Sequence, residues 1–226
     1  MAEYSRLEVY NGIMESGLIP IYYHHDLNTA QRIMEACVSG GAGIIEFTNR
    51  GDRAWQIFSK LLEHRQRNHL DVMLGVGSIV DAPTAAFYIN NGADFIVGPI
   101  LNREIADLCN RRKVAYIPGC GTVNEISAAE ATGAELVKIF PGDVLGPDFV
   151  RAVHGPLPWT NMVVTGGVIP EKDNILAWFK AGVSAVGLGS KLIRKDWVSA
   201  GQFHQITESI SLILKWIEQS EFRRHG

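Results

Sequence analysis

The stretch Gly92-Ala-Asp-Phe-Ile-Val-Gly-Pro99 contains the unit that decides the fold: a glycine, then a short apolar run closed by Gly and Pro. The unit recurs along the chain, because similar pairs of small residues precede other apolar runs at Gly41-Ala42-Gly43, Gly133-Ala134 and Ala181-Gly182. Glycine readily adopts the left-handed conformation that ends many helices. Each pair therefore predicts the end of a helix and the start of a strand.

Eight apolar runs, rich in β-branched residues, alternate with longer segments that have apolar residues at helical spacing. Strands covered on both faces by crossover helices have such continuous apolar sequences. The predicted strands are Leu18–Tyr23, Gly43–Thr48, Asp71–Ser78, Phe95–Ile100, Val114–Gly119, Leu136–Pro141, Asn161–Gly167 and Ala185–Ser190. Because eight successive βα units can close on themselves, the sequence predicts an α/β fold, a (β/α)₈ TIM barrel.

Two amphipathic segments outside these units predict an extra N-terminal helix, Tyr4–Ser16, and a C-terminal helix, Gln202–Ser220. We expect both to cover ends or edges of the barrel. Among the helix starts, Asn28 or Thr29 is expected to begin one helix, and Thr122 with Glu125 to begin another as a capping box. We expect residues 1–226 to form a single domain with a frayed tail at 221–226.

The composition predicts a globular protein with no affinity for nucleic acid or membranes. Of the 226 residues, 46% are hydrophobic and 20% are charged, and the formal net charge is −3. Residues 1–17 lack the apolar core of a signal peptide, and no apolar run approaches the roughly 20 residues that span a bilayer. Cys37, Cys109 and Cys120 have no paired spacing and predict buried thiols in a reducing compartment. We therefore expect a cytoplasmic location.

Lys138 stands in the apolar run Glu135-Leu-Val-Lys-Ile-Phe-Pro-Gly142, where a buried strand should carry no charge. Burying an unpaired ammonium is costly and favours the neutral amine. Because a neutral amine can attack a carbonyl to form a Schiff base, the position indicates a catalytic nucleophile. The structural alternatives are a lysine paired with a carboxylate and a lysine that reaches solvent at the strand end.

Glu46 places a charge in a second apolar strand. A buried carboxyl group tends toward a raised pKa, which suits a group that both accepts and donates protons. Arg50 follows four residues later, on the expected C-terminal face of the barrel, where a guanidinium could hold a substrate carboxylate. Alternatively, Glu46 pairs with Arg50 or serves as the counter-ion of Lys138.

Glycine-rich turns end three other predicted strands. Ser78 closes a run that contains two glycines, which allow the backbone to approach a ligand. Thr165-Gly166-Gly167 and Gly187-Leu-Gly-Ser190 end the last two strands, where such turns commonly bind phosphate in barrels. His24-His25-Asp26 could ligate a metal, but no second cluster with ligand spacing accompanies it. We therefore expect solvated loop residues there and no metal site.

Taken together, the strand ends resemble those of the 2-keto-3-deoxy-6-phosphogluconate (KDPG) and 4-hydroxy-2-oxoglutarate (KHG) aldolase family. The resemblance extends from about Gly17 to Leu192. It rests on Ile45–Arg50, Gly75–Ser78, Gly98-Pro99, Ile117–Gly119, Val137–Pro141 and Thr165–Gly167. It implies a class I aldolase, usually a homotrimer, that cleaves a 2-keto-3-deoxy sugar acid to pyruvate and an aldehyde. It also implies that no metal or other cofactor is needed, because the substrate is held as a covalent Schiff base.

The resemblance also implies roles for individual residues. Lys138 would form the Schiff base, and Glu46 would act as the general acid and base. The pyruvate end of the substrate would contact Arg50, Ser78, Pro99 and Phe140. The distal end, commonly a phosphate, would contact Thr165, Gly166, Gly167, Gly189 and Ser190.

The sequence departs from the family pattern at three places. Tyr22-Tyr23-His24-His25 stands where family members often carry Arg, and the roles of these four residues stay open. Gly142-Asp143 replaces the usual Ala-Glu, and Leu188 replaces a common Gly and is expected to crowd the phosphate end. The pyruvate half of the site is thus expected to be retained, while the length, stereochemistry and phosphorylation of the aldehyde half stay open.

Two other functions fit the same motifs. A ribulose-phosphate-type barrel isomerase or epimerase shares the glycine turns but needs no Schiff base. A sugar-acid-binding barrel without catalysis would bind ligand and show no turnover.

Overall fold

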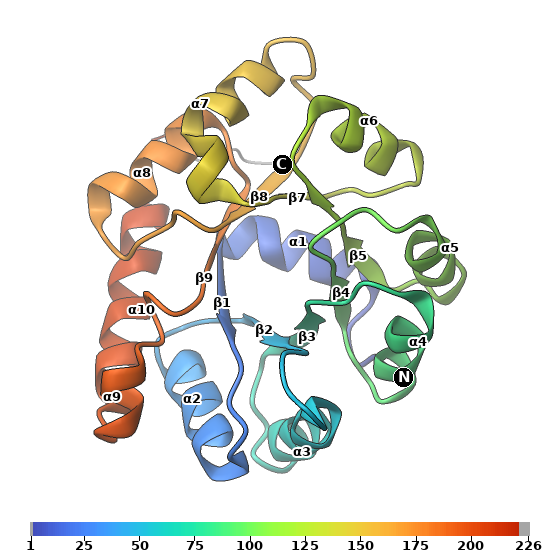
Figure 1. The fold of residues 1–226 in the computed structure, drawn as a ribbon. Coiled ribbons are helices and arrows are strands. Elements are labelled where there is room, and N and C mark those ends of the chain that lie inside the picture. The colour runs from blue at the N-terminus through green and yellow to red at the C-terminus, as the bar shows by residue number, and fades with distance from the viewer. Residues whose placement is uncertain (1, 222–226) are drawn as a thin grey trace.

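Parallel strands surrounded by helices form a barrel in the computed structural model, which describes residues 2–221 (Figure 1). The strands are β1 (Leu18–Tyr22), β2 (Ile44–Thr48), β3 (Met73–Gly77), β4 (Phe95–Val97), β5 (Ala115–Ile117), β6 (Gly119–Cys120), β7 (Val137–Ile139), β8 (Met162–Thr165) and β9 (Ala185–Leu188). Their order in the sheet is β5-β4-β3-β2-β1-β9-β8-β7-β6, and all the pairings between neighbours are parallel. The predicted TIM barrel is therefore confirmed.

The strand predicted at Val114–Gly119 is interrupted at Pro118, which separates β5 from β6. Proline has no N–H to donate to a ladder, so the pairing breaks at this residue. β5 pairs with β4 on one side, and β6 pairs with β7 on the other. The two halves thus act as one strand, the fifth of the eight that were predicted, and they close the barrel between β4 and β7.

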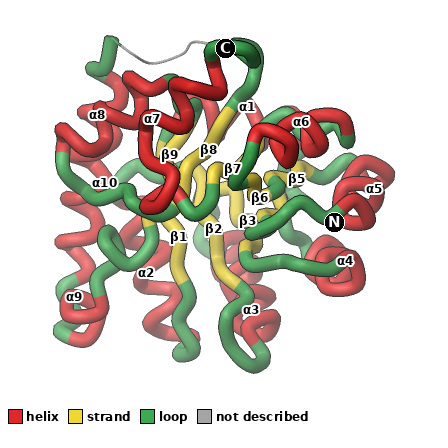
Figure 2. The backbone as a smooth tube through the Cα atoms, turned by 45° about the horizontal axis from the view of Figure 1, so that its top comes forward, coloured by secondary structure: helices red, strands yellow, loops and turns green. Residues whose placement is uncertain are grey.

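Helices surround the barrel, and one of them, the first, lies across its end (Figure 2). They are α1 (Arg6–Ser16), α2 (Leu27–Ser39), α3 (Ala54–Arg67), α4 (Ala82–Asn90), α5 (Arg103–Arg112), α6 (Val123–Ala131), α7 (Gly142–His154), α8 (Lys172–Ala181), α9 (Lys195–Ser199) and α10 (Phe203–Glu218). As predicted, left-handed glycines stand before the strands, with φ between 86° and 105° at Gly41, Gly92, Gly133 and Gly182.

The start of α2 differs from the prediction. Asp26, and neither Asn28 nor Thr29, is the N-cap, because its carboxylate accepts a hydrogen bond from the Thr29 N–H at 2.8 Å. An Asp at this position also places a negative charge at the positive end of the helix dipole.

Thr122 caps α6 as predicted, and its hydroxyl accepts from the Glu125 N–H at 3.2 Å. The Glu125 carboxylate accepts from the Gly121 N–H at 2.8 Å, one residue before the position expected in a capping box.

The extra N-terminal helix fills one end of the barrel. Val9, Tyr10 and Ile13 of α1 are buried against a cluster of residues from the strands that face the barrel interior. The Tyr10 hydroxyl donates to the Tyr116 carbonyl at 3.2 Å and so ties α1 to β5. The C-terminal helix, α10, packs outside the barrel against α2 and α8. Because α1 covers the N-terminal ends of the strands, their carboxyl ends form the open face.

A buried ionic cluster anchors the chain that leads into α1. Asp94 is fully buried at the start of β4, where its carboxylate accepts from the Leu74 N–H at 2.8 Å and from the Glu3 N–H at 2.9 Å. Arg65 of α3 is 3% exposed and pairs with Asp94 and with the Glu3 carboxylate. The cluster therefore links α1, α3 and two strands at the end of the barrel opposite the open face.

The three cysteines are free and buried, as predicted. Burial raises the pKa of the Cys37 thiol well above its ordinary range and the pKa of the Cys109 and Cys120 thiols to about 12. Such thiols stay protonated at neutral pH and are poor nucleophiles. No helix within residues 2–221 combines the length and the apolar character needed to cross a membrane. The tail expected to fray, 221–226, lies outside the described residues except for Glu221, an exposed turn residue.

Candidate active site

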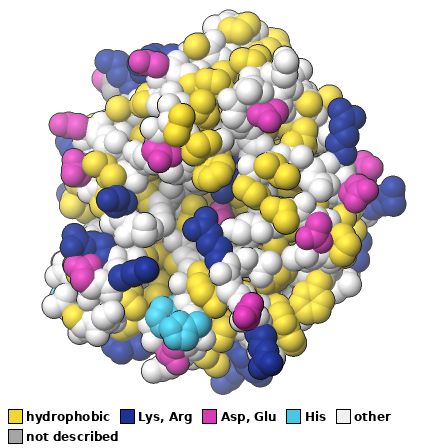
Figure 3. Space-filling view, viewed as in Figure 1, with side chains coloured by type: hydrophobic (Ala, Val, Ile, Leu, Met, Phe, Trp, Pro, Cys, Tyr) yellow, Lys and Arg dark blue, Asp and Glu magenta, His cyan; other side chains and the backbone are white. Residues whose placement is uncertain are grey.

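A cavity of about 480 Å³ opens at the carboxyl ends of the strands. Figure 3 shows the hollow near the centre of this face, with Lys and Arg side chains around it. Its walls come from β1, β2, β7, β8, β9 and the turns that follow them. Of the residues predicted to form the site, all but Ser78 and Pro99 line this cavity. They are Glu46, Arg50, Lys138, Phe140, Thr165, Gly166, Gly167, Gly189 and Ser190.

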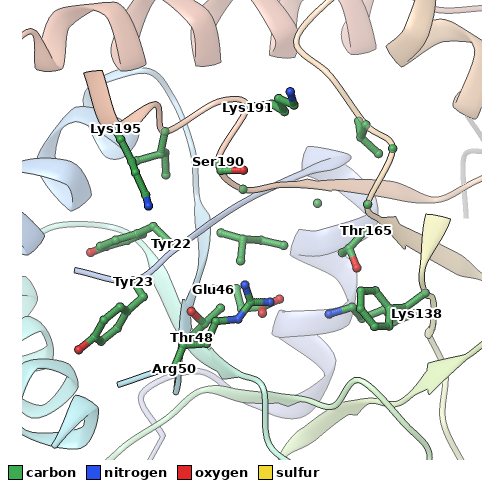
Figure 4. Close-up of a pocket in the computed structure, with 18 residues that line it drawn as sticks. Tyr22, Tyr23, Glu46, Thr48, Arg50, Lys138, Thr165, Ser190, Lys191 and Lys195 are labelled. Atoms are coloured by element: carbon green, nitrogen blue, oxygen red, sulfur yellow. The ribbon is translucent and has the colours of Figure 1, made fainter. Parts of the chain in front are cut away.

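Lys138 is buried in the middle of β7, with 7% of its surface exposed. Its neighbours Val137 and Ile139 pack in the core between strands and helices, so the alternation of a strand directs Lys138 into the barrel. Its Nζ lies 5.2 Å from the centre of the Phe140 ring. In Figure 4 the amine points into the pocket toward Glu46 and Arg50. An amine in this place is both enclosed and accessible to a ligand in the cavity.

Glu46 enters the same cavity from β2 and is 3% exposed. Burial raises the pKa of its carboxyl group, and the charges of Lys138 and Arg50 only partly oppose this effect. Within the described residues no ion pair joins Glu46 to Lys138 or to Arg50, so the structural pairing considered from the sequence is not formed. A carboxyl group with a raised pKa near an amine can move protons during catalysis.

Gly77 of β3 provides the space that Glu46 occupies. A Cβ atom added at Gly77 would overlap the Glu46 carboxylate, so a larger residue would displace the carboxylate from its place. The Gly75-Val-Gly77 run is weak as a ligand motif on its own. Its second glycine, however, is needed to make room for the Glu46 carboxylate.

Arg50 and Ser78 are joined at the rim of the cavity. The Arg50 Nε donates to the Ser78 Oγ at 3.2 Å, although Ser78 itself does not line the cavity. Ser78 has φ of 63°, an unusual conformation for a residue other than glycine, and this turn places its hydroxyl beside the guanidinium. Pro99 does not line the cavity either, and its carbonyl lies against Gly119.

Two glycine-rich turns, of a kind that commonly binds anions, form the far side of the cavity. Gly166 and Gly167 follow β8 with φ of 87° and 69°, and Gly189 and Ser190 follow β9. The Thr165 hydroxyl is buried and has no hydrogen-bond partner among the described residues. Because a buried hydroxyl without a partner is unfavourable, this atom is suited to bind a ligand.

Leu188 does not crowd this end, contrary to the expectation from the sequence. It is 1% exposed and packs in the core between strands and helices, while its neighbours Gly187 and Gly189 line the cavity. The reason is strand alternation, which directs residue 188 outward when residues 187 and 189 face inward.

Some lining residues were not predicted as site residues. Thr48 lies two residues after Glu46 on the same face of β2, so alternation could have identified it. Lys191 and Lys195 follow the last glycine turn, but the polar segment that contains them is typical of an exposed loop.

The four residues from the end of β1 onward, 22–25, to which the sequence assigned no role, lie in different environments. The Tyr22 hydroxyl donates to the Ala30 carbonyl at 2.9 Å, which makes this residue largely structural. Tyr23 lines the cavity. His24 and His25 stack with ring centres 4.9 Å apart next to Asp26. Within residues 2–221 no group of three or more His, Cys, Asp or Glu side chains is placed to hold a metal ion.

A buried lysine and a buried carboxyl group that face one cavity at the carboxyl ends of a TIM barrel are the groups that a class I, Schiff-base aldolase requires. The sequence model described as "KDPG and KHG aldolase" matches residues 9–209. The chain belongs to the KDPG and KHG aldolase family, and it is an aldolase, a lyase. The isomerase and binding-only alternatives are not favoured by this match.

Individual relatives agree with this assignment. The chain is 31% identical over 193 residues to a 2-dehydro-3-deoxy-phosphogluconate aldolase of Pseudomonas aeruginosa, with 84% of each chain covered. It is 35% identical over 127 residues to a 2-dehydro-3-deoxy-6-phosphogalactonate aldolase of Escherichia coli, which covers 54% of this chain and 59% of that one. Among solved structures, a KDPG aldolase from Legionella pneumophila with pyruvate captured as a covalent carbinolamine has the same fold. The TM-score is 0.81 at 24% identity, and the match covers 89% of this chain and 96% of that one.

Proposed function

We propose that this aldolase reversibly cleaves a 2-keto-3-deoxy sugar acid, either 6-phosphorylated and KDPG-like or 4-hydroxy-2-oxoglutarate, to pyruvate and an aldehyde. The observation that carries the proposal is the pair of buried side chains, Lys138 and Glu46, that face one cavity with Arg50 at its rim. With a 6-phosphogluconate-derived acid the reaction would be the cleavage step of the Entner–Doudoroff pathway.

In the proposed mechanism Lys138 acts as the nucleophile. Its neutral Nζ attacks C2 of the substrate to give a carbinolamine, which loses water to form a protonated imine. The imine draws electrons from the C3–C4 bond as the C4 hydroxyl loses its proton, so that bond breaks and the aldehyde departs. The remaining enamine takes up a proton at C3, and water then hydrolyses the imine to release pyruvate and free Lys138. No metal or other cofactor takes part in these steps.

Glu46 is the proposed proton carrier of this sequence. Its raised pKa allows it to protonate the hydroxyl that leaves the carbinolamine and, once ionised, to accept the proton of the C4 hydroxyl. It would act directly or through one water molecule.

The proposed substrate contacts divide the cavity into two ends. At the pyruvate end Arg50, held by Ser78, would bind the carboxylate, with Phe140 enclosing the methyl side. Pro99, which does not line the cavity, is not among these contacts. At the distal end the phosphate or another polar group would meet the hydroxyl and backbone N–H groups of Thr165, Gly166, Gly167, Gly189 and Ser190.

We further propose a cytoplasmic homotrimer, on the basis of the family. Trp55 and Phe87 are exposed apolar residues whose ring centres lie 5.4 Å apart. Val80 and Ile100 are exposed on neighbouring loops. Exposed apolar surface of this kind commonly marks a protein contact.

In light scattering after gel filtration, Phe87→Asp should reduce the mass toward that of one chain. The control Leu212→Asp, on the outer surface of α10, should keep the mass of three chains, and equal masses for both variants would reject this surface.

A cleavage assay tests the proposed reaction. Purified protein would be mixed in turn with KDPG, its galacto epimer and 4-hydroxy-2-oxoglutarate, and pyruvate release would be followed with lactate dehydrogenase. We expect pyruvate from at least one of these acids in wild type and none from Lys138→Arg, which keeps the charge but cannot form the imine. Equal release by the variant would reject the mechanism, and no release from any acid would reject this substrate class.

A further inference from the structure

Cationic side chains outnumber carboxylates in the lining of the active-site cavity. Four cationic side chains, Arg50, Lys138, Lys191 and Lys195, line it together with a single carboxylate, Glu46. Glu46 lies at the end that contains Lys138 and Arg50, whereas Lys191 and Lys195 lie at the other end (Figure 4). The far end therefore has positive charge with no carboxylate in its lining.

Lys195 has no carboxylate partner among residues 2–221. The acidic residue next to it, Asp196, is already bound, because the Arg194 guanidinium donates to its two oxygens at 3.0 and 2.6 Å. Arg194 also lies over the Trp197 ring, with its Cζ 4.9 Å from the ring centre, and it does not line the cavity. The local ion pair thus leaves the Lys195 charge available to a ligand.

Lys195 also stands where two cavities meet. A smaller chamber of about 370 Å³ shares Tyr23, Ile193 and Lys195 with the main cavity, and His24 and His25 form part of its wall. In Figure 4 the Lys195 amine extends toward Tyr22 and Tyr23, whereas the Lys191 amine points away from Glu46. Of the two lysines, Lys195 is the one aimed at a ligand that spans the cavity.

The chamber beyond Lys195 offers hydrogen-bond donors. His24 and His25 line this chamber, and each neutral imidazole has one N–H. The His24 Nδ1 lies 3.1 Å from the Asp26 backbone nitrogen and 3.2 Å from the Asp26 carbonyl oxygen, so the tautomer decides which ring nitrogen of His24 is the donor. A donor and a cation near one another suit an anion better than a neutral hydroxyl.

We propose that Lys195 binds the terminal anionic group of the substrate's aldehyde half, a phosphate or a carboxylate, and so selects charged over uncharged aldehydes. The inference rests on the proposed function and adds to it a specificity residue on the turn after β9. Lys195 does not touch the reacting atoms, so its loss weakens binding of the distal end without altering the chemistry at Lys138.

The test uses aldol addition, in which the protein joins pyruvate to one of three aldehydes. Glyceraldehyde 3-phosphate carries a terminal phosphate, succinic semialdehyde carries a terminal carboxylate, and glyceraldehyde is uncharged. Wild type is compared with Lys195→Met, with the conservative variant Lys195→Arg, and with the control Lys215→Met, a lysine on the outer surface of α10.

We expect wild type to prefer a charged aldehyde, and Lys195→Met to lose that preference in kcat/KM by on the order of 10- to 100-fold, mainly through KM. The preference should also weaken as salt rises, because Lys195 is exposed. Lys195→Arg should restore most of it, and Lys215→Met should match wild type. A preference for the phosphate aldehyde identifies a phosphate as the terminal group, and a preference for the semialdehyde identifies a carboxylate.

Trapping of pyruvate with borohydride in the same preparations separates the two proposals. Wild type that traps pyruvate but does not distinguish charged from uncharged aldehydes would overturn the role of Lys195 and leave the proposed function standing. The same holds if Lys195→Met keeps the full preference. Wild type that traps no pyruvate would overturn the proposed function and this inference with it.

Discussion

Lys138 and Glu46 are charged residues inside otherwise apolar strands, and both side chains enter one cavity. The glycine at position 77 leaves room there for the Glu46 carboxylate. Burial dominates the environment of Glu46, and its raised pKa follows from that burial. At the residue scale, therefore, the site has the properties of a proton carrier beside an amine.

Glu46→Gln should lower kcat of cleavage by on the order of 10²–10⁴-fold while the protein stays folded, because an amide cannot transfer protons. Steady-state kinetics with the best acid of the substrate panel, together with circular dichroism, would measure both quantities. The control Glu63→Gln, a residue paired with Lys60 on the surface of α3, should have the wild-type rate. An unchanged rate in Glu46→Gln would make Glu46 a structural residue.

The same variant should change how stability depends on pH. The folded-state pKa of Glu46 lies above its ordinary value of 4.5, so the folded protein binds this proton more tightly than the unfolded chain does. Its contribution to stability is therefore fully present below pH 4.5 and is lost as the pH rises through the folded-state pKa. Urea unfolding over a pH series should show Glu46→Gln gaining stability relative to wild type above pH 4.5. A difference that shrinks with rising pH would contradict this.

At the scale of elements, the strands were predictable because each is a short apolar run after a helix-ending glycine. Helix starts were less predictable. Asp26, Asn28 and Thr29 are all good caps, and only the path of the chain after β1 decides that Asp26 is used. The same limit applies to Ser78 and Pro99, because spacing alone does not tell which residues of a turn face the cavity.

The distal half of the site was also beyond prediction. Lys191 and Lys195 lie in a polar segment, and lysines in such segments are usually solvated. They belong to the site because the turn after β9 and the short helix α9 return to the rim of the cavity. Leu188 is the opposite case. It differs from the family sequence and was expected to affect the site, but its side chain faces the core.

The ionic cluster at the start of α1 should contribute strongly to stability. Asp94→Asn would leave the buried Arg65 with the Val72 carbonyl and the more exposed Glu3 carboxylate as partners, and we expect a loss of about 3–5 kcal/mol in the free energy of unfolding. Asp71→Asn, which weakens one exposed hydrogen bond from the Tyr4 hydroxyl, should cost about 1 kcal/mol or less. Chemical denaturation measures the free energy of unfolding of both variants. Equal losses would show that burial of the Asp94–Arg65 pair adds nothing to its contribution to stability.

At the scale of the whole molecule, the two ends of the barrel have different roles. α1 and the Asp94 cluster close the N-terminal end, and the open end carries the cavity with its cationic lining. This division separates the residues that stabilise the fold from those that bind the substrate, as is usual in TIM barrels. It also explains why the reaction class could be recognised from strand ends alone, whereas the selection of the aldehyde depends on loops.

The most direct test of the central claim is to incubate wild-type protein with pyruvate, reduce it with borohydride, and map any adduct by peptide mass spectrometry. The account predicts one reduced pyruvyl group, located on Lys138 and absent from Lys138→Arg treated in the same way. An adduct on another lysine, or no adduct on folded wild-type protein, would contradict the account.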